Sequence, residues 1–428
     1  MSREHGAAGA VPAEAVLDHV GDGADVIVPI ANGEPVALLD VLEEHVDRFE
    51  HVRIHQMHAL HDRPYLHGKL KPQMGHISYF LSPVTRPAHD EGGLDFRPAN
   101  FSEVPALLRS SAQVGVVLAA ASPMDRHGYF SLGTGADYTA SFIGRVPFFL
   151  EVNHRMPRTW GRNQVHVSQI AGWTEVDRPL VEIAPPPSTD VDARIASFVA
   201  ERIANGSTLQ IGIGGIPNAI LALLHEHEHL GVHTELLSDG LVDLVEAGVV
   251  TGVHKTVNRT KMVGTFVLGT RRVYDFVNDN ASVELWPVER VNDPREIGRE
   301  QRFVSVNATL EVDLFGQCAS ETLNGRYWSG SGGQADFARG AMYSPEGQGF
   351  VVLPSTARDG TLSRIVPQLG PGQVVTTLKN TVDHVVTEFG VAKLRGRSLR
   401  ERARALIAVA HPDHRDRLRH EAERLGFL

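Results

Sequence analysis

The stretch LQIGIGGIPNA, Leu209–Ala219, sets the expected fold of this chain. An apolar run enters a glycine cluster, and Pro217 then opens an apolar helical pattern. Glycine allows a tight turn and a close approach of backbone N–H groups to a ligand, and proline is favoured in the first turn of a helix. We therefore predict a strand, a glycine turn and a helix starting at Pro217. A helix N-terminus favours negative charge, although a tight turn without any ligand explains the pattern equally simply.

Short Val/Ile-rich runs bounded by Gly or Pro recur on both sides of this stretch and alternate with helical patterns. They are Asp25–Ile30, Val114–Ala120, Phe148–Val152, Thr208–Ile213, Phe303–Val306, Phe350–Leu353 and Asp383–Val386. Continuous apolar strands interleaved with helices are typical of parallel sheets covered on both faces. The sequence thus predicts an α/β protein with largely parallel sheets.

Three consecutive prolines in the segment 185–190 predict a stiff connector, because such a run fits neither a helix nor a sheet. We expect a flexible tail over residues 1–13, an N-terminal domain over 14–184 and a C-terminal domain over 191–428. The halves resemble distant copies, since a strand followed by Gly-x-Pro and an apolar helix occurs in each. The run Asp125–Tyr129 is also echoed by Asp313–Gln317. Paired homologous α/β domains commonly hold an active site in the cleft between them, which is the arrangement expected here.

Composition excludes several classes of protein. The 428 residues carry a formal net charge of −10, which argues against a general nucleic-acid binder. The chain has one cysteine and no apolar run long enough to span a membrane, and Met1–Ala13 lacks the layout of a signal peptide. These features predict a cytoplasmic protein with no nucleic-acid or membrane partner. In addition, Pro217 stands where the dinucleotide fingerprint Gly-x-Gly-x-x-Gly needs its last glycine, so a nicotinamide dehydrogenase is disfavoured.

Two further motifs could carry chemistry. The run VHTELLSDG, Val232–Gly240, predicts a strand that ends near Glu235, beside the glycine turn. A carboxylate close to N–H groups that can hold an oxyanion has the parts of a covalent catalyst, although a lone glutamate is more often a solvated loop residue. The glycine-rich run Ser329–Phe337 suits a nest of backbone N–H groups, with a flexible surface loop as the alternative.

Three rival features have simpler structural interpretations. Glu311 and Asp313 share one face of an expected strand and could exchange a proton, but a structural role is favoured. The histidines His51, His55, His58 and His61 cluster in sequence, yet metal ligation needs supporting ligands that spacing cannot show, so no metal site is predicted. Cys318 is expected to be a small core or cleft residue and not a nucleophile.

Together these motifs resemble the acetyl-CoA hydrolase/transferase family, which includes 4-hydroxybutyrate, butyrate and succinyl-CoA:acetate CoA-transferases. The stretches that carry the resemblance run from 122 to 413: SPMDRHGYFSLG at 122–133, MPRTWG at 156–161, GIGGIPNA at 212–219, HTELLSDG at 233–240, SGSGGQADFARG at 329–340, SRIVP at 363–367, VVTEFG at 385–390 and AHPD at 410–413. The resemblance implies a two-domain fold of the CoA-transferase type, usually assembled as a homodimer or higher homo-oligomer. It implies no tightly bound cofactor, with coenzyme A and acyl-CoA as substrates beside a small carboxylate.

The resemblance also assigns residues. It makes Glu235 the nucleophile, gives Ile213 and Gly333 the backbone N–H groups of an oxyanion hole, and gives Asn292 a role in binding CoA or holding the glutamate. CoA or substrate binding is further expected of Gly212, Gly214, Gly215, Gly332, Arg364 and Lys379. Many relatives carry Arg where this chain has Lys379, and lysine lacks the planar fork of arginine, which puts one CoA contact in doubt.

The implied reaction moves CoA between an acyl-CoA and a carboxylate through a glutamyl-CoA thioester. A hydrolase in which water resolves the same intermediate is the near alternative, and a catalytically inactive CoA-binding or regulatory protein is the distant one. Without an additional cation near Glu235, acetate, propionate, butyrate or 4-hydroxybutyrate is favoured over a dicarboxylate such as succinate. The sequence does not identify the acyl group or the physiological direction.

Overall fold

The computed structural model describes residues 9–428, which divide into two compact units. Of the described residues, unit 1 comprises those up to Arg97, Glu103–Glu182 and Thr265–Glu289. Unit 2 comprises Pro98–Ser102, Ile183–Gly264 and Arg290–Leu428. The expected C-terminal domain, 191–428, therefore differs from unit 2, since the segment Thr265–Glu289 packs within unit 1 although it follows the proline-rich connector along the chain.

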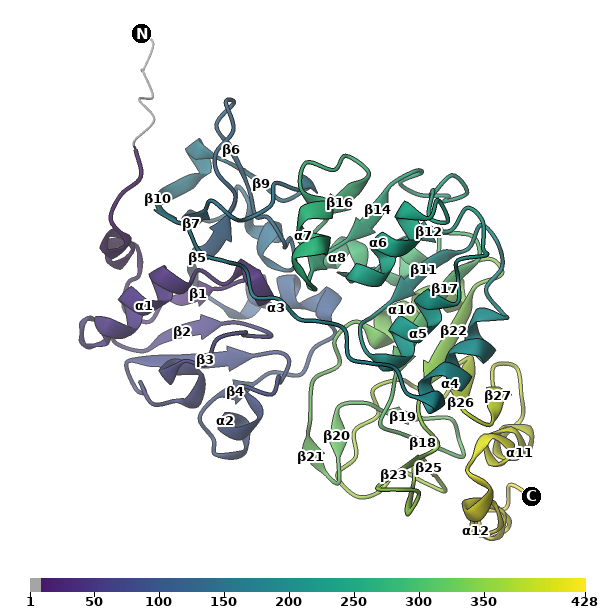
Figure 1. Cartoon of the computed structure of the whole chain (residues 1–428). Coiled ribbons are helices and arrows are strands. Elements are labelled where there is room, and N and C mark those ends of the chain that lie inside the picture. The colour runs from purple at the N-terminus through teal and green to yellow at the C-terminus, as the bar shows by residue number, and fades with distance from the viewer. Residues whose placement is uncertain (1–8) are drawn as a thin grey trace. The chain divides into compact units, whose positions relative to one another are not determined.

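Unit 1 is built on a seven-stranded sheet in the order β10-β7-β5-β1-β2-β3-β4 (Figure 1). Its strands are β1 (Asp25–Ile27), β2 (Val52–His55), β3 (Met74–Ser78), β4 (Asp95–Phe96), β5 (Val114–Ala121), β7 (Phe148–Asn153) and β10 (Ile170–Val176). All neighbouring pairs in this sheet are parallel. Other elements of this unit are η1 (Ala13–His19), η2 (Ala31–Gly33), α1 (Val36–Glu44), η3 (Val46–Arg48), η4 (Pro64–His67), α2 (Arg86–Asp90), α3 (Val104–Ser111), β6 (Tyr129–Ser131), η6 (Thr139–Phe142), β8 (Trp160–Gly161), β9 (Gln164–His166), η7 (Val167–Gln169), β15 (Phe266–Val267), α7 (Arg271–Val277) and β16 (Val283–Leu285).

Unit 2 is built on a six-stranded sheet in the order β12-β11-β17-β22-β26-β27. Its strands are β11 (Thr208–Ile211), β12 (Gly231–Val232), β17 (Phe303–Ala308), β22 (Gln348–Val352), β26 (His384–Thr387) and β27 (Gly390–Lys393). Only the β26–β27 pair of this sheet is antiparallel. The helices of this unit are α4 (Asp190–Ala200), α5 (Gly215–Ala222), α6 (Asp239–Glu246), α9 (Pro294–Ile297), α10 (Gln334–Tyr343), α11 (Leu399–Val409) and α12 (Pro412–Arg424), while α8 (Val288–Val291) and η5 (Phe101–Glu103) cross from one unit to the other. Its shorter strands are β13 (Leu236–Leu237), β14 (Met262–Gly264), β18 (Glu311–Asp313), β19 (Cys318–Ala319), β20 (Thr322–Leu323), β21 (Arg326–Tyr327), β23 (Thr356–Ala357), β24 (Leu362–Ser363) and β25 (Ile365–Val366).

The two sheets repeat one topology. In the unit 2 sheet, the first strand along the chain, β11, lies between the second, β12, and the third, β17. Strands β22 and β26 then follow in chain order, which gives β12-β11-β17-β22-β26. The sheet of unit 1 contains the same sequence of neighbours, β2-β1-β5-β7-β10, with β3 and β4 added at the β2 edge. The prediction of an α/β protein with two homologous domains and largely parallel sheets is confirmed.

The two echoed motifs fold into the same turn. Oδ1 of Asp125 accepts hydrogen bonds from the N–H groups of His127 and Tyr129, two and four residues further on. Oδ1 of Asp313 accepts from the N–H groups two and four residues further on in the same way. The glycine at the fourth position adopts a φ of 85° in the first turn and 87° in the second, a region that favours glycine. This match supports the duplication that the sequence predicts.

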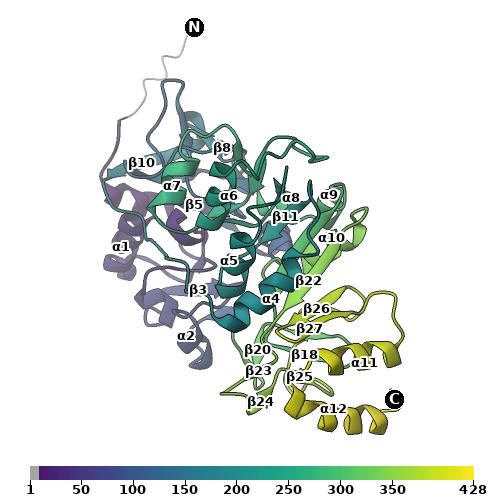
Figure 2. The same ribbon diagram turned by 45° about the vertical axis from the view of Figure 1, so that its right-hand side comes forward.

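Element boundaries differ from the sequence prediction at the ends of strands. All seven predicted runs form strands, but the first ends at Ile27 and the fourth ends at Ile211. Helix α5 begins at Gly215, two residues before Pro217, because Gly214 breaks the extended chain with a φ of 131°. Figures 1 and 2 show α5 beside α4, whose first residue, Asp190, was expected to belong to the connector.

The termini of the described chain are held by packing. The expected flexible tail, residues 1–13, lies mostly outside the described residues, but its last residues are ordered. The N–H of Val11 donates to the carbonyl of Trp173 at 2.8 Å, and η1 begins at Ala13. At the other end, α11 packs against β27 and α12 packs against α11 (Figure 2), and Leu406 and Leu418 on these helices join Leu394 in one buried cluster. Across residues 9–428, no helix has the length and apolar character required to cross a membrane.

Candidate functional site

Glu235 lies at the carboxyl edge of the unit 2 sheet. Strand β12 ends at Val232, and its parallel neighbour β11 ends at Ile211, just before the glycine turn. Parallel neighbours end at the same edge of a sheet, where α/β proteins commonly bind ligands. The hydroxyl of Thr234 also donates to the carbonyl of Ile211 at 3.2 Å, which ties the segment before Glu235 to the strand before the turn.

Three of the residues assigned by the family resemblance meet at this edge. The side-chain amide Nδ2 of Asn292 donates a hydrogen bond to Oε2 of Glu235 at 2.7 Å. A Cβ placed at Gly333 would overlap both Oε2 of Glu235 and Nδ2 of Asn292. Glycine is therefore the residue that fits at position 333 while the carboxylate holds this orientation.

The surroundings of Glu235 disfavour its charged form. Burial raises the pKa of its carboxyl from the ordinary 4.5 to about 7, and the hydrogen bond from Asn292 offsets this only in part. Within residues 9–428, Oδ1 of Asn292 and Oγ of Ser238 are buried without a hydrogen-bond partner. A carboxylate supported by one neutral donor is less stabilised than a carboxylate in an ion pair and keeps more of its basicity.

Two backbone N–H groups near this edge are free to donate. Within the described residues, no acceptor takes the N–H of Ile213 or of Gly333. Gly333 is the N-cap of α10, where unpaired N–H groups and the helix dipole favour an anion. Ile213 lies in the turn before α5, with a side chain that is 46% exposed. Both groups have the character expected of oxyanion donors.

Three of the four other glycines of the expected site have structural explanations. Gly214 and Gly332 adopt positive φ values, 131° and 53°, and the carbonyl of Gly332 accepts the N–H of Phe101 at 2.9 Å. A Cβ at Gly215 would come within 2.7 Å of a carboxylate oxygen of Asp192 on α4. Gly212 leaves open space around its missing Cβ. Close packing therefore accounts for Gly215 without a ligand.

The two expected cations lie elsewhere in unit 2. Arg364, between β24 and β25, is half-buried, and its backbone N–H donates to the carbonyl of Ser355. Lys379 is exposed, and its carbonyl accepts a bond from Arg402. In the part of the chain that the structure describes, neither side chain forms an ion pair, and no hydrogen bond links either of them to Glu235. Their assignment to CoA binding stays a prediction.

The rival features form structural contacts. Asp313 makes the turn described above, and Glu311 accepts a bond from Gln373 at 2.6 Å. Cys318 is fully buried, and burial raises the pKa of its thiol. His55 lies between Asp25 and Tyr79, with ring-nitrogen distances of 2.8 Å to both. Residues 9–428 contain no group of three or more His, Cys, Asp or Glu side chains arranged to hold a metal ion.

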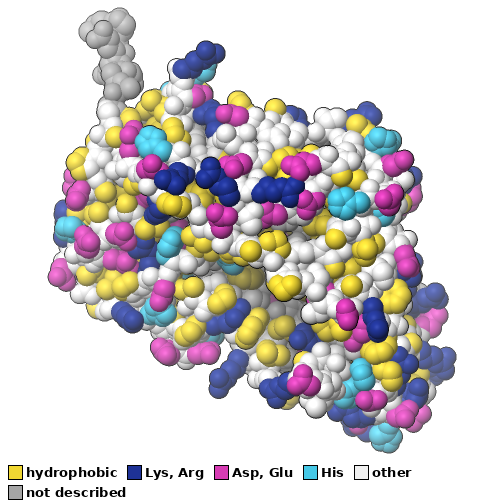
Figure 3. All heavy atoms as spheres, in the orientation of Figure 1, with side chains coloured by type: hydrophobic (Ala, Val, Ile, Leu, Met, Phe, Trp, Pro, Cys, Tyr) yellow, Lys and Arg dark blue, Asp and Glu magenta, His cyan; other side chains and the backbone are white. Residues whose placement is uncertain are grey.

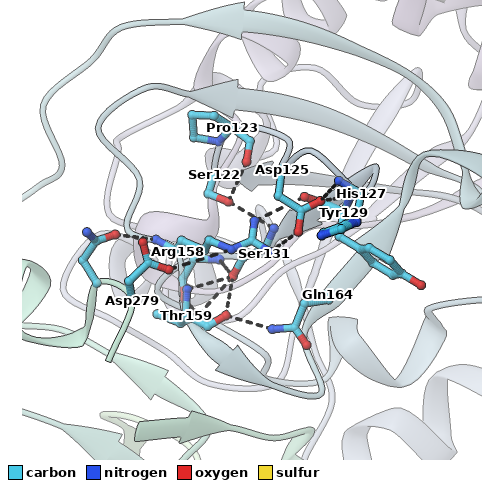
Figure 4. Close-up of polar contacts among 12 residues, drawn as sticks. Ser122, Pro123, Asp125, His127, Tyr129, Ser131, Arg158, Thr159, Gln164 and Asp279 are labelled. Carbon is cyan, nitrogen blue, oxygen red and sulfur yellow. Dashed lines mark hydrogen bonds and ion pairs between the residues drawn. The ribbon is translucent and has the colours of Figure 1, made fainter. Parts of the chain in front are cut away.

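The two unit 1 motifs of the resemblance form one polar cluster (Figure 4). The guanidinium of Arg158 contacts Oδ2 of Asp125 at 2.8 Å and donates to the carbonyl of Tyr129. The hydroxyl of Ser131 lies 3.1 Å from the hydroxyl of Thr159 and receives the N–H of that residue. The two N–H groups of the turn and Arg158 lower the pKa of Asp125. These contacts explain both motifs by local structure.

A cavity of about 340 Å³ lies within unit 1, and none of the expected site residues lines it. Its lining includes Arg155, Arg271, Tyr274, Asp275 and Glu182. Arg271 pairs with Asp275, while Glu182 accepts the N–H of Arg271. Acidic and basic side chains are likewise interspersed over the face drawn in Figure 3.

The sequence prediction missed His233 and Lys255, two buried side chains next to the strand that leads to Glu235. His233 contacts the carbonyl of Val291 at 2.7 Å, and the ammonium of Lys255 donates to the carbonyl of Val232 at 2.8 Å. His233 stands in the quoted HTELLSDG motif, so its position was visible, but the contact it makes was not. Lys255 gave no signal in the sequence.

Comparisons with known proteins show which proteins this chain is similar to. Residues 10–185 match the model of the acetyl-CoA hydrolase/transferase N-terminal domain, and residues 269–422 match the model of the C-terminal domain. The chain is 46% identical to a succinyl-CoA:cyclohexane-1-carboxylate CoA transferase of Geobacter metallireducens, covering 96% of this chain and 94% of that protein. It is 41% identical to a 4-hydroxybutyrate coenzyme A transferase of Clostridium kluyveri, covering 96% of each. The crystal structure of RipA from Yersinia pestis superposes with a TM-score of 0.92 at 35% identity, covering 98% of both chains.

Proposed function

Since the chain belongs to the acetyl-CoA hydrolase/transferase family and is an enzyme of the CoA-transferase class, we propose that Glu235 is its nucleophile and carries CoA as a thioester. The observation that supports this role is the Glu235 carboxylate held between the amide of Asn292 and the glycine backbone at position 333. The rival carboxylate Asp313 also has a raised pKa, but its Oδ1 is occupied by the N–H groups of Phe315 and Gln317.

The first half of the reaction loads CoA onto the enzyme. An oxygen of the Glu235 carboxylate attacks the thioester carbon of the acyl-CoA, and the C–S bond breaks to give a mixed anhydride and CoA thiolate. The thiolate then attacks the glutamyl carbonyl of the anhydride. The acyl group leaves as a free carboxylate, and the glutamyl-CoA thioester remains.

The second half of the reaction reverses these steps with a second carboxylate as the acceptor. The incoming carboxylate attacks the glutamyl thioester and expels CoA thiolate, which forms a second mixed anhydride. The thiolate attacks the acyl carbonyl of that anhydride, releasing a new acyl-CoA and the free Glu235 carboxylate. No proton or redox equivalent is needed, because every attacking and leaving group is an anion.

Stabilisation of the tetrahedral oxyanions falls to the N–H groups of Ile213 and Gly333 in this proposal. Each attack develops negative charge on a carbonyl oxygen, and one such donor typically contributes about 3 kcal/mol to transition-state stabilisation. Backbone donors that have no other acceptor do not need to break an existing bond first. Partial burial of Glu235 reduces the exposure of the anhydride and the thioester to water, which would hydrolyse them.

The proposed substrates are short monocarboxylic acids of the acetate, propionate, butyrate or 4-hydroxybutyrate type. The partner of the Glu235 carboxylate is the neutral amide of Asn292, and no hydrogen bond or ion pair connects this carboxylate to a cation within residues 9–428. The second carboxylate of a dicarboxylic substrate would therefore find no cationic side chain to pair with beside the nucleophile. A homodimer or higher homo-oligomer in the cytoplasm, with CoA phosphates held by Arg364 and Lys379, completes the proposal.

Intact mass spectrometry after mixing with acetyl-CoA or butyryl-CoA, without an acceptor, tests the nucleophile. We expect an addition of the mass of CoA, less water, on wild-type protein and none on Glu235→Ala. Hydroxylamine or borohydride treatment followed by peptide mapping should place the modification on the peptide that contains Glu235. An addition that persists in Glu235→Ala would exclude this glutamate as the carrier.

Addition of acetate or butyrate then distinguishes transfer from hydrolysis. A transferase loses the CoA adduct at a rate that rises with carboxylate concentration and forms the new acyl-CoA. A hydrolase releases free CoA at a rate that is independent of the carboxylate. Succinate that accelerates turnover as strongly as acetate would contradict the proposed preference for monocarboxylates.

A further inference from the structure

The residue two positions before Glu235 is a buried histidine that reaches the segment carrying Asn292. His233 is 4% exposed, and its Nε2 lies 2.7 Å from the carbonyl oxygen of Val291. Val291 is the last residue of α8 and directly precedes Asn292. A carbonyl can only accept, so Nε2 carries the proton and donates this bond.

The ring of His233 is held in the neutral form. Burial lowers its pKa to about 3, and the nearby ammonium of Lys255 adds to the effect. Lys255 lies 3.7 Å from the carboxylate of Glu300, and both side chains are fully buried. The ring of Phe303 packs edge-on against the imidazole at 6.1 Å. The imidazole therefore stays neutral and donates its bond to Val291 throughout the working pH range.

The backbone of this segment is fixed independently of the imidazole. The N–H of His233 donates to the carbonyl of Leu209 on β11, and the N–H of Thr234 donates to the carbonyl of Val263 at 2.9 Å. The imidazole is thus attached to a rigid strand at one end and to the carbonyl before Asn292 at the other. A side chain in this position transmits the placement of the strand to Asn292.

We propose that His233 is a positioning residue for the nucleophile: its Nε2–H bond to the Val291 carbonyl fixes Asn292, and the amide of Asn292 in turn fixes the carboxylate of Glu235. The inference rests on the proposed function of Glu235. Reactions that need an attacking oxygen in a defined orientation lose rate steeply when a supporting contact is removed.

Two substitutions separate this role from general packing. His233→Leu replaces the imidazole with an apolar side chain of similar size and removes the Nε2–H donor. His233→Gln retains a side-chain N–H donor of similar reach. His227→Leu is the matched control, because Nε2 of His227 contacts the carbonyl of Ile203 at 3.0 Å in the same manner. Ile203 stands five residues before Thr208, the first residue of β11, so this bond lies on the side of the strand away from the glycine turn.

The measurement is the rate of CoA-adduct formation from butyryl-CoA, followed by rapid quench and intact mass spectrometry between pH 5.5 and 9. We expect His233→Leu to slow formation about 10–100-fold with an unchanged half-saturating butyryl-CoA concentration. Its acid limb should move to higher pH, because a displaced Asn292 no longer lowers the pKa of Glu235. His233→Gln should recover most of the rate, and His227→Leu should match wild type.

A double-mutant cycle makes the result decisive. In an Asn292→Ala background, replacing His233 should add little further loss, since both residues act through one contact. Full additivity, a wild-type rate in His233→Leu, or equal losses in His233→Leu and His227→Leu would overturn the proposal. If His233→Leu does not fold, His233→Asn, whose side chain is too short to reach Val291, takes its place in the cycle. Absence of any adduct on wild-type protein would instead count against the role of Glu235.

Discussion

Two carboxylates in quoted motifs, Asp125 in unit 1 and Glu235 in unit 2, have opposite surroundings. Asp125 accepts two backbone N–H groups and pairs with the guanidinium of Arg158, and these contacts lower its pKa. Glu235 receives one neutral amide, and burial raises its pKa to about 7. One carboxylate is stabilised in its charged form, and the other is not.

This difference separates structural motifs from reactive ones. A carboxylate with its lone pairs occupied stabilises a turn but is a poor nucleophile, since attack would require breaking those bonds. A carboxylate with a raised pKa and unpaired N–H groups nearby destabilises the free protein and is available for reaction. Recurrence of a motif in a family does not distinguish these cases, whereas the recorded partners of each oxygen do.

The comparison is tested most strongly by amide substitutions at both positions. Glu235→Gln should lower the rate of CoA transfer by at least about 10⁴-fold, because the amide cannot form the anhydride. Asp125→Asn should keep the transfer rate of the folded protein within about threefold and lower its stability instead. Steady-state transfer assays and thermal unfolding of both variants would check this. A loss of activity in Asp125→Asn that exceeds its loss of folded protein would remove the distinction.

Gly333→Ala should have the next largest effect. Its Cβ would overlap both the Glu235 carboxylate and the Asn292 amide, so the carboxylate must leave its orientation. We expect adduct formation to fall about 10²–10³-fold, in line with the loss of an oxyanion donor and alignment. Gly370→Ala is the control, since nothing lies within 4 Å of a Cβ at that position. Similar rates for both alanine variants would show that position 333 tolerates a side chain.

Asn292→Leu sharpens the electrostatic part of the comparison. The amide hydrogen bond lowers the pKa of Glu235 against the effect of burial, so its removal raises that pKa further above 7. More of the carboxyl is then protonated at pH 7, and the acid limb of the rate profile moves to higher pH, with a loss of about tenfold at neutral pH. A profile that keeps its midpoint after this substitution would argue against the hydrogen bond in solution.

The smallest effects are on stability, and they should have opposite signs. Between pH 4.5 and 7 the native Glu235 retains a proton that the unfolded chain has released, so native stability falls as pH rises through this window. Glu235→Gln should therefore be more stable than wild type at pH 8, by about 1 kcal/mol, with the gain vanishing toward pH 4.5.

Asp125→Asn should behave in the reverse way. The pKa of Asp125 is lowered from 3.8 in the folded protein, so its contribution is present above that pH and is lost as pH falls through the folded value. The asparagine variant should lose about 1 kcal/mol at pH 7 and approach wild type in acid. Denaturant unfolding at about pH 3, 4.5, 7 and 8 measures both variants, and equal signs at pH 8 would contradict the contrast.

Local pattern was sufficient for the main elements of the fold. Apolar runs bounded by glycine or proline predicted the seven strands, because strand burial on both faces requires continuous apolar sequence. The ends of strands were less accurate: Gly214 and the turn before it shorten β11, and α5 starts two residues early. The regrouping of Thr265–Glu289 with unit 1 was not predicted, since no local signal marks which sheet a segment packs against.

What the sequence by itself determined is therefore the α/β class and the duplication, and its HTELLSDG motif singled out Glu235 as the proposed nucleophile. The family resemblance left Asn292 either binding CoA or holding the glutamate, and the tertiary structure shows that its amide, 57 residues further on, donates to Glu235 and that Gly333 packs against both. It also decided that Gly215 accommodates Asp192 and that His233 reaches Val291. Periodicity and turn chemistry depend on neighbours along the chain, whereas hydrogen bonds between distant segments depend on strand register and helix packing, which short stretches of sequence do not specify.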